Sequence, residues 1–381
     1  MAFSKKKWVL LPISILVFLG IAYWGVGKIQ YRLHIMDVEE YEPISTLNVQ
    51  EHLLTKAKFP FIDVHNHQFT MPIQNLDKLV MDMDDLNMAV MVNLSGFRGK
   101  YLEWSLDNVN EKYSDRFTLF MNIDFEKLDD EGWPNETLSM MEEAVKMGVK
   151  GLKVYKNLGL TETDNDGNRI KVNDPRLDPI WEKCGELGIP VLIHTGEPAA
   201  FWLPKDKHNE RWLELKQYPT RYKDPEKNPS FEEVMAEQHH VFRNHPNTKF
   251  IAAHLGWFGN DLARLEKLLD EMPNVYTEIG AVLAELGRQP ITARAWLIAN
   301  QDRVLMGKDS YNKEEYYTYF RVLETSDEYF DYYRKRHAHW KMYGLSLPDS
   351  VLQKIYYKNA LNVIPGIDSS LFEIEGNEVT N

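Results

Sequence analysis

Short apolar runs recur along the chain from about residue 59 onward, and longer amphipathic stretches separate them. The runs are rich in Val, Ile, Leu, Met and Phe, which is typical of strands buried on both faces of a parallel sheet. They predict eight strands, at residues 61–65, 88–94, 117–123, 149–155, 190–194, 248–254, 275–279 and 303–306. Eight strands that alternate with helices predict the α/β class and a (β/α)8 TIM barrel.

The intervals between these runs carry helix start and stop signals. Helices are predicted, for example, at residues 135–147 and 178–187, and the second ends before Gly188. Two intervals, 199–246 and 310–347, are longer than a minimal barrel needs, and they follow the fifth and eighth predicted strands. Long loops at the C-terminal face of such a barrel usually carry specificity, so we expect both loops to contribute to it.

The N-terminal region combines three lysines with an apolar run. Lys5, Lys6 and Lys7 precede an uncharged stretch at residues 8–26. A helix of this length spans roughly 30 Å, about the hydrocarbon thickness of a bilayer. By the positive-inside rule, we expect the lysines to stay cytoplasmic and the barrel to lie on the periplasmic, extracytoplasmic side. A cleaved signal peptide is the alternative, but its apolar core is usually shorter.

These features predict four segments along the chain. Residues 1–27 form a cytoplasmic tip and a transmembrane signal anchor, and residues 28–58 form a linker and lead-in. The barrel occupies residues 59–365, and a flexible acidic tail follows at residues 366–381. The membrane is therefore an expected partner, bound through the N-terminal helix, and an oligomer is compatible with this organisation.

Charge and cysteine content narrow the classes of partner and site. The 381 residues include 44 Lys and Arg against 57 Asp and Glu, a net charge of −13. Such a chain repels phosphate backbones, so we expect no nucleic-acid partner. The single cysteine, Cys184, rules out an intrachain disulfide and a cysteine-based zinc site.

Two histidines form a His-x-His motif, His65 and His67, at the end of the first predicted strand. Side chains two apart on a strand point the same way, so both imidazoles can face the barrel axis and share one metal ion. The alternative is a pair of strand-end histidines bonded to the backbone. His194 and His254 end the fifth and sixth predicted strands, and Asp309 follows the eighth. All five groups thus collect where catalytic groups of this fold lie.

This arrangement resembles the amidohydrolase superfamily, in particular its amidohydrolase-related branch, over residues 59–365. That branch includes hydrolases, lactonases, hydratases and non-oxidative decarboxylases. The resemblance implies one divalent metal ion bound by His65, His67, His194 and Asp309. It also implies that His254 orients water or polarises the substrate. Imidazole and carboxylate ligands with an open position favour zinc, and the same set would accept manganese or iron.

A second metal ion is implied if Lys153 is carboxylated. The sequence Gly151-Leu152-Lys153 is similar to the Phe-Lys of cyclic-amidase relatives, whose carboxylated lysine bridges two metals. In that case Lys153 is the bridge, and His194 and His254 bind the second ion. Alternatively, an ordinary lysine binds a substrate carboxylate or pairs with a neighbouring acid.

Three charged residues near strand ends add to the predicted site. Lys308 stands where relatives usually place a small Thr, and its charge would lower the pKa of Asp309 if the two meet. Glu197 lies three residues past His194, where it is a partner of a ligand, an acceptor for a substrate hydroxyl or a solvated loop acid. Glu278 ends the seventh predicted strand and could likewise be a partner of a ligand.

Further residues are candidates for substrate contact with weaker support. Lys156 follows the fourth predicted strand as a cation that could face substrate, and Trp257 lies near the long loops. Arg288 could clamp an acidic group, although surface arginine is the default reading. The predicted substrate-binding set is Lys156, Glu197, Trp257, Glu278, Arg288 and Lys308.

The expected reaction is metal-dependent hydrolysis of a small molecule. A metal-activated water attacks a carbonyl of a lactone, ester or amide, Asp309 takes the proton of the water, and His254 stabilises the developing oxyanion. Two alternatives remain: a non-oxidative decarboxylase on the same metal-binding barrel, in which Asp309 protonates the substrate carbon, and a non-catalytic binding protein.

Overall fold

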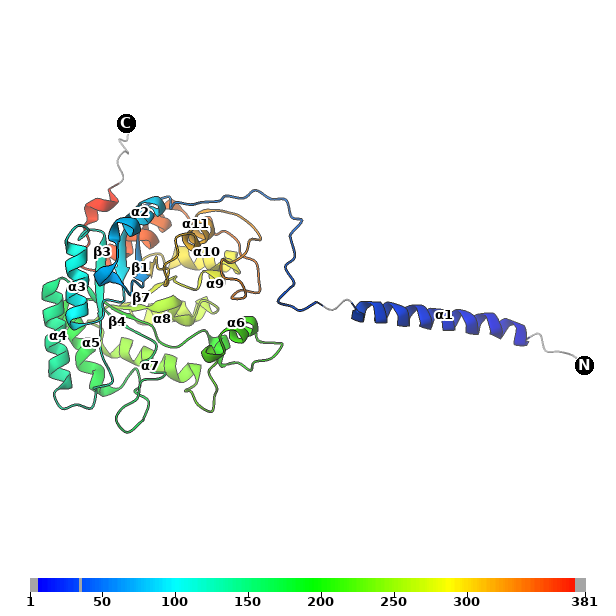
Figure 1. The fold of residues 1–381 in the computed structure, drawn as a ribbon, viewed down its shortest axis with the longest axis horizontal. Helices are drawn as coiled ribbons and strands as arrows, with labels where there is room; N and C mark the ends of the chain where they lie inside the picture. Colours follow the sequence, from blue (N-terminus) through cyan, green and yellow to red (C-terminus); the bar gives the residue numbers. More distant parts are fainter. Residues whose placement is uncertain (1–5, 34–35, 374–381) are drawn as a thin grey trace, which may run out of the picture. The chain divides into compact units, whose positions relative to one another are not determined.

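The computed structural model describes residues 6–33 and 36–373. The chain divides into two compact units, Met1–Asn48 and Val49–Asn381 (Figure 1). Outside the described residues lie the start of the predicted cytoplasmic tip and the end of the predicted tail, residues 1–5 and 374–381.

The N-terminal unit contains one long helix, α1 (Lys6–Leu33). Within the portion of the chain that the structure describes, no helix is long and apolar enough to cross a membrane. This finding contradicts the predicted transmembrane anchor and the extracytoplasmic localisation, and it leaves the predicted membrane partner without support.

The second unit is built on parallel strands that pair with one another in chain order, β1 to β8, among the described residues (Figure 1). Two contacts bring the last strand back to the first: Val64 N–H donates to Met306 O at 3.0 Å, and Asn66 forms a bridge with Asp309. The predicted TIM barrel is confirmed. The strands are β1 (Phe61–Asn66), β2 (Met88–Asn93), β3 (Phe117–Asn122), β4 (Gly151–Val154), β5 (Val191–Ile193), β6 (Phe250–Ala252), β7 (Val275–Glu278) and β8 (Val304–Leu305).

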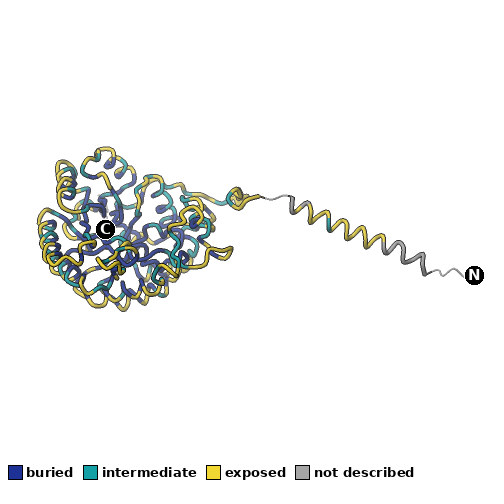
Figure 2. The backbone as a smooth tube through the Cα atoms, turned by 60° about the horizontal axis from the view of Figure 1, so that its bottom comes forward, coloured by how far each residue is buried: buried dark blue, intermediate teal, exposed yellow. Residues whose placement is uncertain are grey.

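Burial on both faces explains the continuous apolar runs of these strands. Every residue of β1, β3 and β4 is buried, and Figure 2 shows buried chain at the centre with exposed segments around it. Strands β5 and β6 end one or two residues before His194 and His254. Both histidines therefore sit just beyond the hydrogen-bonded ladder, where their side chains are free to turn toward the barrel axis.

Helices follow the strands and surround the barrel (Figure 1). The helix predicted at residues 178–187 is α5, and Gly188 ends it in the left-handed conformation with φ 68°. The helix predicted from residue 135 begins two residues earlier, because Pro134 is well suited to a first helical turn. The main helices are α2 (Leu76–Leu86), α3 (Gly99–Asn110), α4 (Trp133–Met147), α5 (Asp178–Leu187), α7 (Phe231–Asn244), α8 (Leu262–Glu271), α10 (Pro290–Ala299), α12 (Asp349–Gln353) and α13 (Asn359–Val363).

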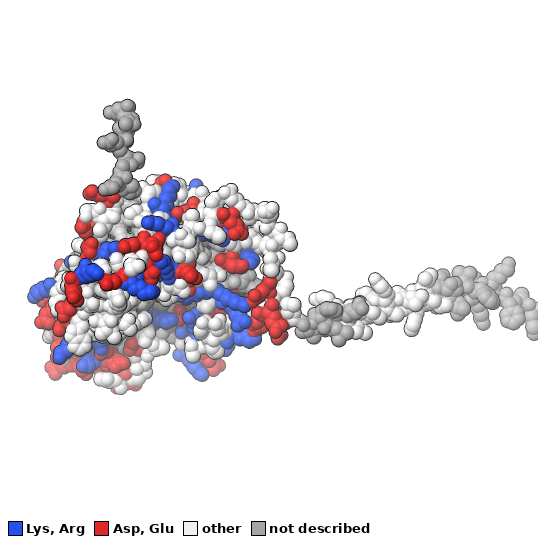
Figure 3. Space-filling view, turned by 45° about the horizontal axis from the view of Figure 1, so that its top comes forward, with Lys and Arg blue, Asp and Glu red and all other residues white. Residues whose placement is uncertain are grey.

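The long loops after β5 and β8 are confirmed, and each contains a further helix, α6 (Trp212–Gln217) and α11 (Glu315–Glu324). Buried Arg211 joins the first loop to the second and to α9 (Leu283–Gly287). Its guanidinium lies 2.7 Å from a carboxylate oxygen of Glu285 and donates to the backbone oxygen of His337 at 3.0 Å. On the face shown in Figure 3, acidic and basic side chains are interspersed.

Candidate metal centre

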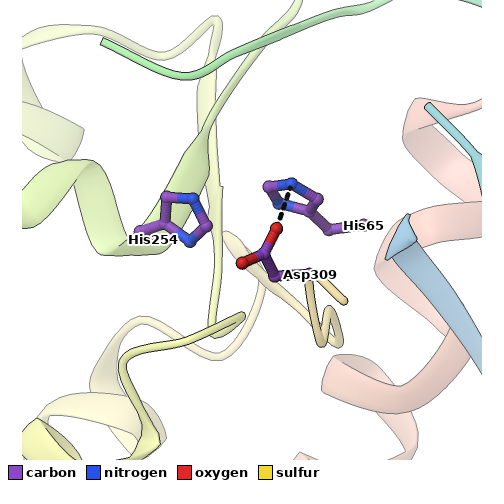
Figure 4. A group of neighbouring side chains, drawn as sticks. All are labelled: His65, His254 and Asp309. Carbon is purple, nitrogen blue, oxygen red and sulfur yellow. Dashed lines mark ion pairs between the residues drawn. The ribbon is translucent and has the colours of Figure 1, made fainter. Parts of the chain in front are cut away.

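Three of the predicted groups converge at the C-terminal end of the barrel strands. His65, His254 and Asp309 each offer one ligand atom, and these three atoms all lie within 4.8 Å of one another. Figure 4 shows the Asp309 carboxylate directed toward the two imidazoles, which come from different strand ends. The Nε2 atom of His65 lies 3.4 Å from Asp309 Oδ1. These three residues lie up to 244 positions apart in the sequence, and the fold brings their side chains together at one point.

The first strand orients both histidines of the His-x-His motif. His65 is fully buried, and its Nδ1 donates to Glu278 Oε1 at 2.9 Å. Its Nε2 is buried and has no hydrogen-bond partner among the described residues. His67 Nδ1 lies 2.8 Å from Ser95 Oγ, and its Nε2 lies 3.7 Å from Asp309 Oδ1. Each ring is thus anchored through Nδ1 and presents Nε2 to Asp309, as a metal ligand would.

His254 is held by an unusual turn after β6. Residues 254–257 have φ values of 54° to 60°, a left-handed run that only Gly256 adopts without strain. The Nδ1 atom of His254 donates to the Gly280 backbone oxygen at 2.8 Å, and its own backbone N–H donates to Glu278 Oε1 at 2.6 Å. Because Nδ1 is engaged by Gly280, Nε2 is the ring nitrogen that remains to act as a ligand. Sequence reasoning found this histidine but not the strained turn, for which Gly256 is the only signal.

His194 lies beside His254 rather than within the group of three. Its Nδ1 is 3.4 Å from His254 Nε2, and its buried Nε2 has no hydrogen-bond partner in the described part of the chain. Burial first, and then the charges of His254 and Lys153, lower the pKa of His194 well below its usual value. The ring is therefore neutral and available as a ligand near neutral pH.

Asp309 has a strained backbone and a carboxylate that stays ionised. Its φ is 84°, and its N–H donates to the backbone oxygen of His65 at 2.6 Å. Burial acts to raise the pKa of this carboxyl group, but the fields of His65, His254, His67 and Lys153 outweigh burial and hold the pKa well below its usual range. Asp309 is thus an anionic ligand or proton acceptor over the whole physiological pH range.

Lys308 precedes Asp309 but points its ammonium group elsewhere. The ammonium is fully buried and binds the Glu315 carboxylate and the backbone oxygen of Ser310. Lys308 therefore pairs with Glu315, the first residue of α11 (Glu315–Glu324), and not with the Asp309 carboxylate that it would have to meet to lower the pKa of that group. The lysine that helps to lower the pKa of Asp309 is instead Lys153.

Lys153, on β4, has a buried amine near the metal centre. Its side chain is buried, and its amine has no hydrogen-bond partner among the residues that the structure describes. Burial lowers the pKa of this amine to about 7, although Asp309 and Glu278 act in the opposite direction. A buried amine without a partner is costly, so its retention indicates that it meets another group in the working protein.

Two supporting residues tie the centre together. Glu278, at the end of β7, is fully buried and accepts hydrogen bonds from His65, from the His254 backbone and from Gly280 N–H. It therefore contacts two of the candidate ligands. Ser95, just past β2, was missed by sequence reasoning, although the strand-end rule that found the histidines applies to it as well.

The remaining predicted substrate contacts fall into two groups. Lys156 and Glu197 form an ion pair at 2.5 Å, and the charge of Lys156 contributes to the lowered pKa of His194. The Trp257 ring lies beside that of His254, with centroids 4.6 Å apart and ring planes tilted by 32°. Arg288 instead pairs with Glu210 at 2.7 Å and lies over the Trp340 ring, within the contact between the two long loops. It helps to hold the loops together and does not join the histidine cluster.

The donor set fits a divalent metal ion. Neutral imidazoles present unprotonated nitrogens toward one ionised carboxylate, and the buried Nε2 atoms of His65 and His194 have no hydrogen-bond partners among the described residues. Imidazole and carboxylate suit zinc, manganese and iron alike. His65 donates its Nδ1–H to the Glu278 carboxylate, and metal-binding histidines usually make such a hydrogen bond through the ring nitrogen that does not bind the metal.

The metal-free protein is expected to lose stability on acidification. Burial lowers the pKa of His67 from 6.5 to about 4, so the unfolded chain binds more protons than the folded chain between these values. Stability therefore falls as the pH falls through this window, by about 3 kcal/mol for His67 alone. Urea unfolding of the metal-free protein at pH 7, 5.5 and 4.5 measures the loss. His67→Gln should reduce it, while His208→Gln, at an exposed position, should not.

Comparison with known proteins identifies the family. The family model described as Amidohydrolase matches residues 32–365. No curated protein shows a significant match. Similar solved structures include a dihydroxybenzoic acid decarboxylase from Polaromonas with bound manganese and 2-nitroresorcinol, at 14% identity over 80% of this chain and 96% of that chain with a TM-score of 0.52. An uncharacterized TIM-barrel protein from Bordetella bronchiseptica gives 16% identity, 80% and 98% coverage and a TM-score of 0.50.

These structural likenesses concern the fold, because the identities are low. The family match is the stronger finding, since it spans the whole barrel and most of the chain. It agrees with the resemblance drawn from the histidines and Asp309, and with an enzyme that acts on a small molecule. The protein belongs to the amidohydrolase family of metal-dependent enzymes.

Proposed function

We propose that the protein hydrolyses a lactone, ester or amide bond of a small molecule with the help of a divalent metal ion. The observation that carries the proposal is the convergence of His65, His254 and Asp309 within 4.8 Å, with Lys153 and His194 beside them. Such a set of neutral imidazoles and one ionised carboxylate binds a cation and also supplies a proton acceptor.

The residues proposed to hold the metal are His65, His67, His194 and Asp309, and His254 is close enough to join them. Zinc is our first choice, and manganese or iron would be accepted by the same ligands. A bound divalent ion polarises a carbonyl group and lowers the pKa of water from about 16 towards 7. A second ion would require carboxylation of Lys153.

Asp309 and His254 have distinct tasks in this proposal. Asp309 remains ionised, so it accepts the proton of the attacking water and returns it to the leaving group. His254 is proposed to stabilise the developing oxyanion, because its ring lies at the same point and its orientation is fixed by the Nδ1–H donation to Gly280.

Removal and return of the metal test the proposal. Treatment with a chelator should abolish turnover of a panel of lactones, esters and amides, and zinc, manganese or iron should restore it. Elemental analysis gives the metal and its stoichiometry, and incorporation of ¹⁸O from labelled water into the product identifies hydrolysis. Carbon dioxide release from an acid without any hydrolytic product would contradict the proposal and select the decarboxylase. A purified protein that binds no metal would favour the non-catalytic alternative.

A further inference from the structure

The turn that carries Asp309 is strained, and backbone contacts to β1 hold its first half. Asp309 has a φ of 84°, in the left-handed region that residues other than glycine rarely adopt. The N–H of Lys308 donates to Asp63 Oδ1 at 3.1 Å, and the N–H of Asp309 donates to the backbone oxygen of His65 at 2.6 Å. Both contacts precede the Cα atom of Asp309, so a further contact is needed to hold the chain after it.

The side chain of Lys308 supplies the contact beyond Asp309. Its ammonium group donates to the backbone oxygen of Ser310, two residues along the chain, and so closes a ring that encloses Asp309. The same ammonium binds the Glu315 carboxylate at the start of α11, and Arg334 lies 3.6 Å from that carboxylate. The Lys308 side chain is fully buried, so water does not compete for these contacts.

From this geometry, we infer that Lys308 is a positioning residue: its side chain clamps the strained turn and keeps the Asp309 carboxylate directed at the metal ion. The inference rests on the proposed function, which makes Asp309 both a ligand and the proton acceptor. The carboxylate points toward His65 and His254, with Oδ1 3.4 Å from His65 Nε2 (Figure 4). Without the clamp, the backbone of Asp309 can relax to a negative φ, which turns the carboxylate away from this position.

Replacement of Lys308 by Met separates the clamp from the charge of the lysine. Methionine keeps the length of the side chain but has no group to donate to Ser310. If only charge mattered, the loss of a cation beside the centre would tighten the binding of zinc. Loss of the clamp predicts the opposite, so Lys308→Met should bind zinc about tenfold more weakly, as when other groups that orient metal ligands are removed. Competition with a chromogenic chelator measures this affinity.

A second variant allows for the possibility that Lys308→Met folds poorly. That substitution leaves the Glu315 carboxylate without its lysine, and breaking one half of a buried ion pair is destabilising. Lys308→Met combined with Glu315→Gln removes both charges, leaves the net charge unchanged and should show the same tenfold loss. The matched control is Lys313→Met, because Lys313 lies in the same loop and pairs with Asp82 of α2 at 2.9 Å. Its loss should leave zinc affinity unchanged.

Two further measurements show whether the effect passes through Asp309. Glycine adopts a φ of 84° without strain and has no carboxylate to direct. In an Asp309→Gly background, the paired Lys308→Met and Glu315→Gln substitutions should therefore cause less than a twofold further loss of zinc affinity. Cobalt in place of zinc gives visible absorption bands that depend on ligand geometry. These bands should change in Lys308→Met and not in Lys313→Met, a difference that a general loss of stability does not produce.

Several results would overturn the clamp. These are zinc affinity at or above the native value in both clamp variants, an equal loss in Lys313→Met, a full tenfold loss in the Asp309→Gly background, or unchanged cobalt bands. Failure of the hydrolytic proposal is distinguishable, because these measurements need no turnover. A protein that shows the clamp effects but hydrolyses no ester, lactone or amide would retain the clamp and lose only the proposed reaction.

Discussion

Replacement of Asp309 by Asn is expected to lower kcat by about 10²- to 10⁴-fold, the range found when a general base is removed. The carboxylate is the one anion in the group of three ligand atoms, and its pKa lies well below the usual range despite burial. An asparagine amide has the same shape but cannot accept a proton from water. The histidines remain as ligands, so bound metal should be largely retained.

The backbone at this position makes Asn a fair test. Asp309 has a φ of 84°, and Asn tolerates the left-handed region better than most residues do. The turn that carries the side chain should therefore survive. Steady-state kinetics together with elemental analysis measure the two effects separately. The control is Asp261→Asn, since Asp261 caps α8 and asparagine caps a helix equally well.

Two outcomes of this experiment would count against the assignment. Full activity of Asp309→Asn would show that another group takes the proton. Complete loss of metal from the variant would show that Asp309 acts mainly as a ligand, so the fall in kcat would no longer report proton transfer. An unchanged metal content with a large fall in kcat is the result that supports its role as base.

Much of the barrel was predictable because burial on both faces produces apolar runs that stand out from their surroundings. All eight predicted strands are present, with ends shifted by at most a few residues. The site followed from one rule: polar groups that end the strands of a parallel barrel meet at one face. That rule brought together His65, His254 and Asp309 without any knowledge of the loops.

Features that depend on tertiary contacts could not be predicted from local sequence. Lys308 pairs with Glu315 and not with Asp309, because the packing of α11 brings Glu315 next to the lysine. Likewise, chemistry alone made Arg288 a candidate clamp for an acidic group, and its contacts with Glu210 and the Trp340 ring between the long loops depend on the tertiary fold. The anchor was inferred from an apolar run at the N-terminus, and within the described residues no helix meets the requirements of a membrane span.

Loss of Glu278 is expected to weaken metal binding about 10- to 100-fold, the usual effect of removing the partner of a metal-binding histidine. One carboxylate oxygen accepts from His65 Nδ1 and from the His254 backbone, and the other accepts from Gly280 N–H. In Glu278→Ala these donors lose their acceptor inside the barrel, which also costs about 1–3 kcal/mol of stability for each buried group. Competition with a chromogenic chelator gives the metal affinity, and urea unfolding gives the stability.

A second variant and a control separate orientation from simple destabilisation. Glu278→Gln keeps the size of the side chain but turns one acceptor into an NH₂ donor that faces either Gly280 N–H or the His65 and His254 donors, so it too should lose metal affinity. Glu237 is also buried and binds Arg169, and Glu237→Gln should lower stability without changing metal affinity. Native metal affinity in both Glu278 variants would contradict the role of this carboxylate, because the two imidazoles would then hold their positions without it.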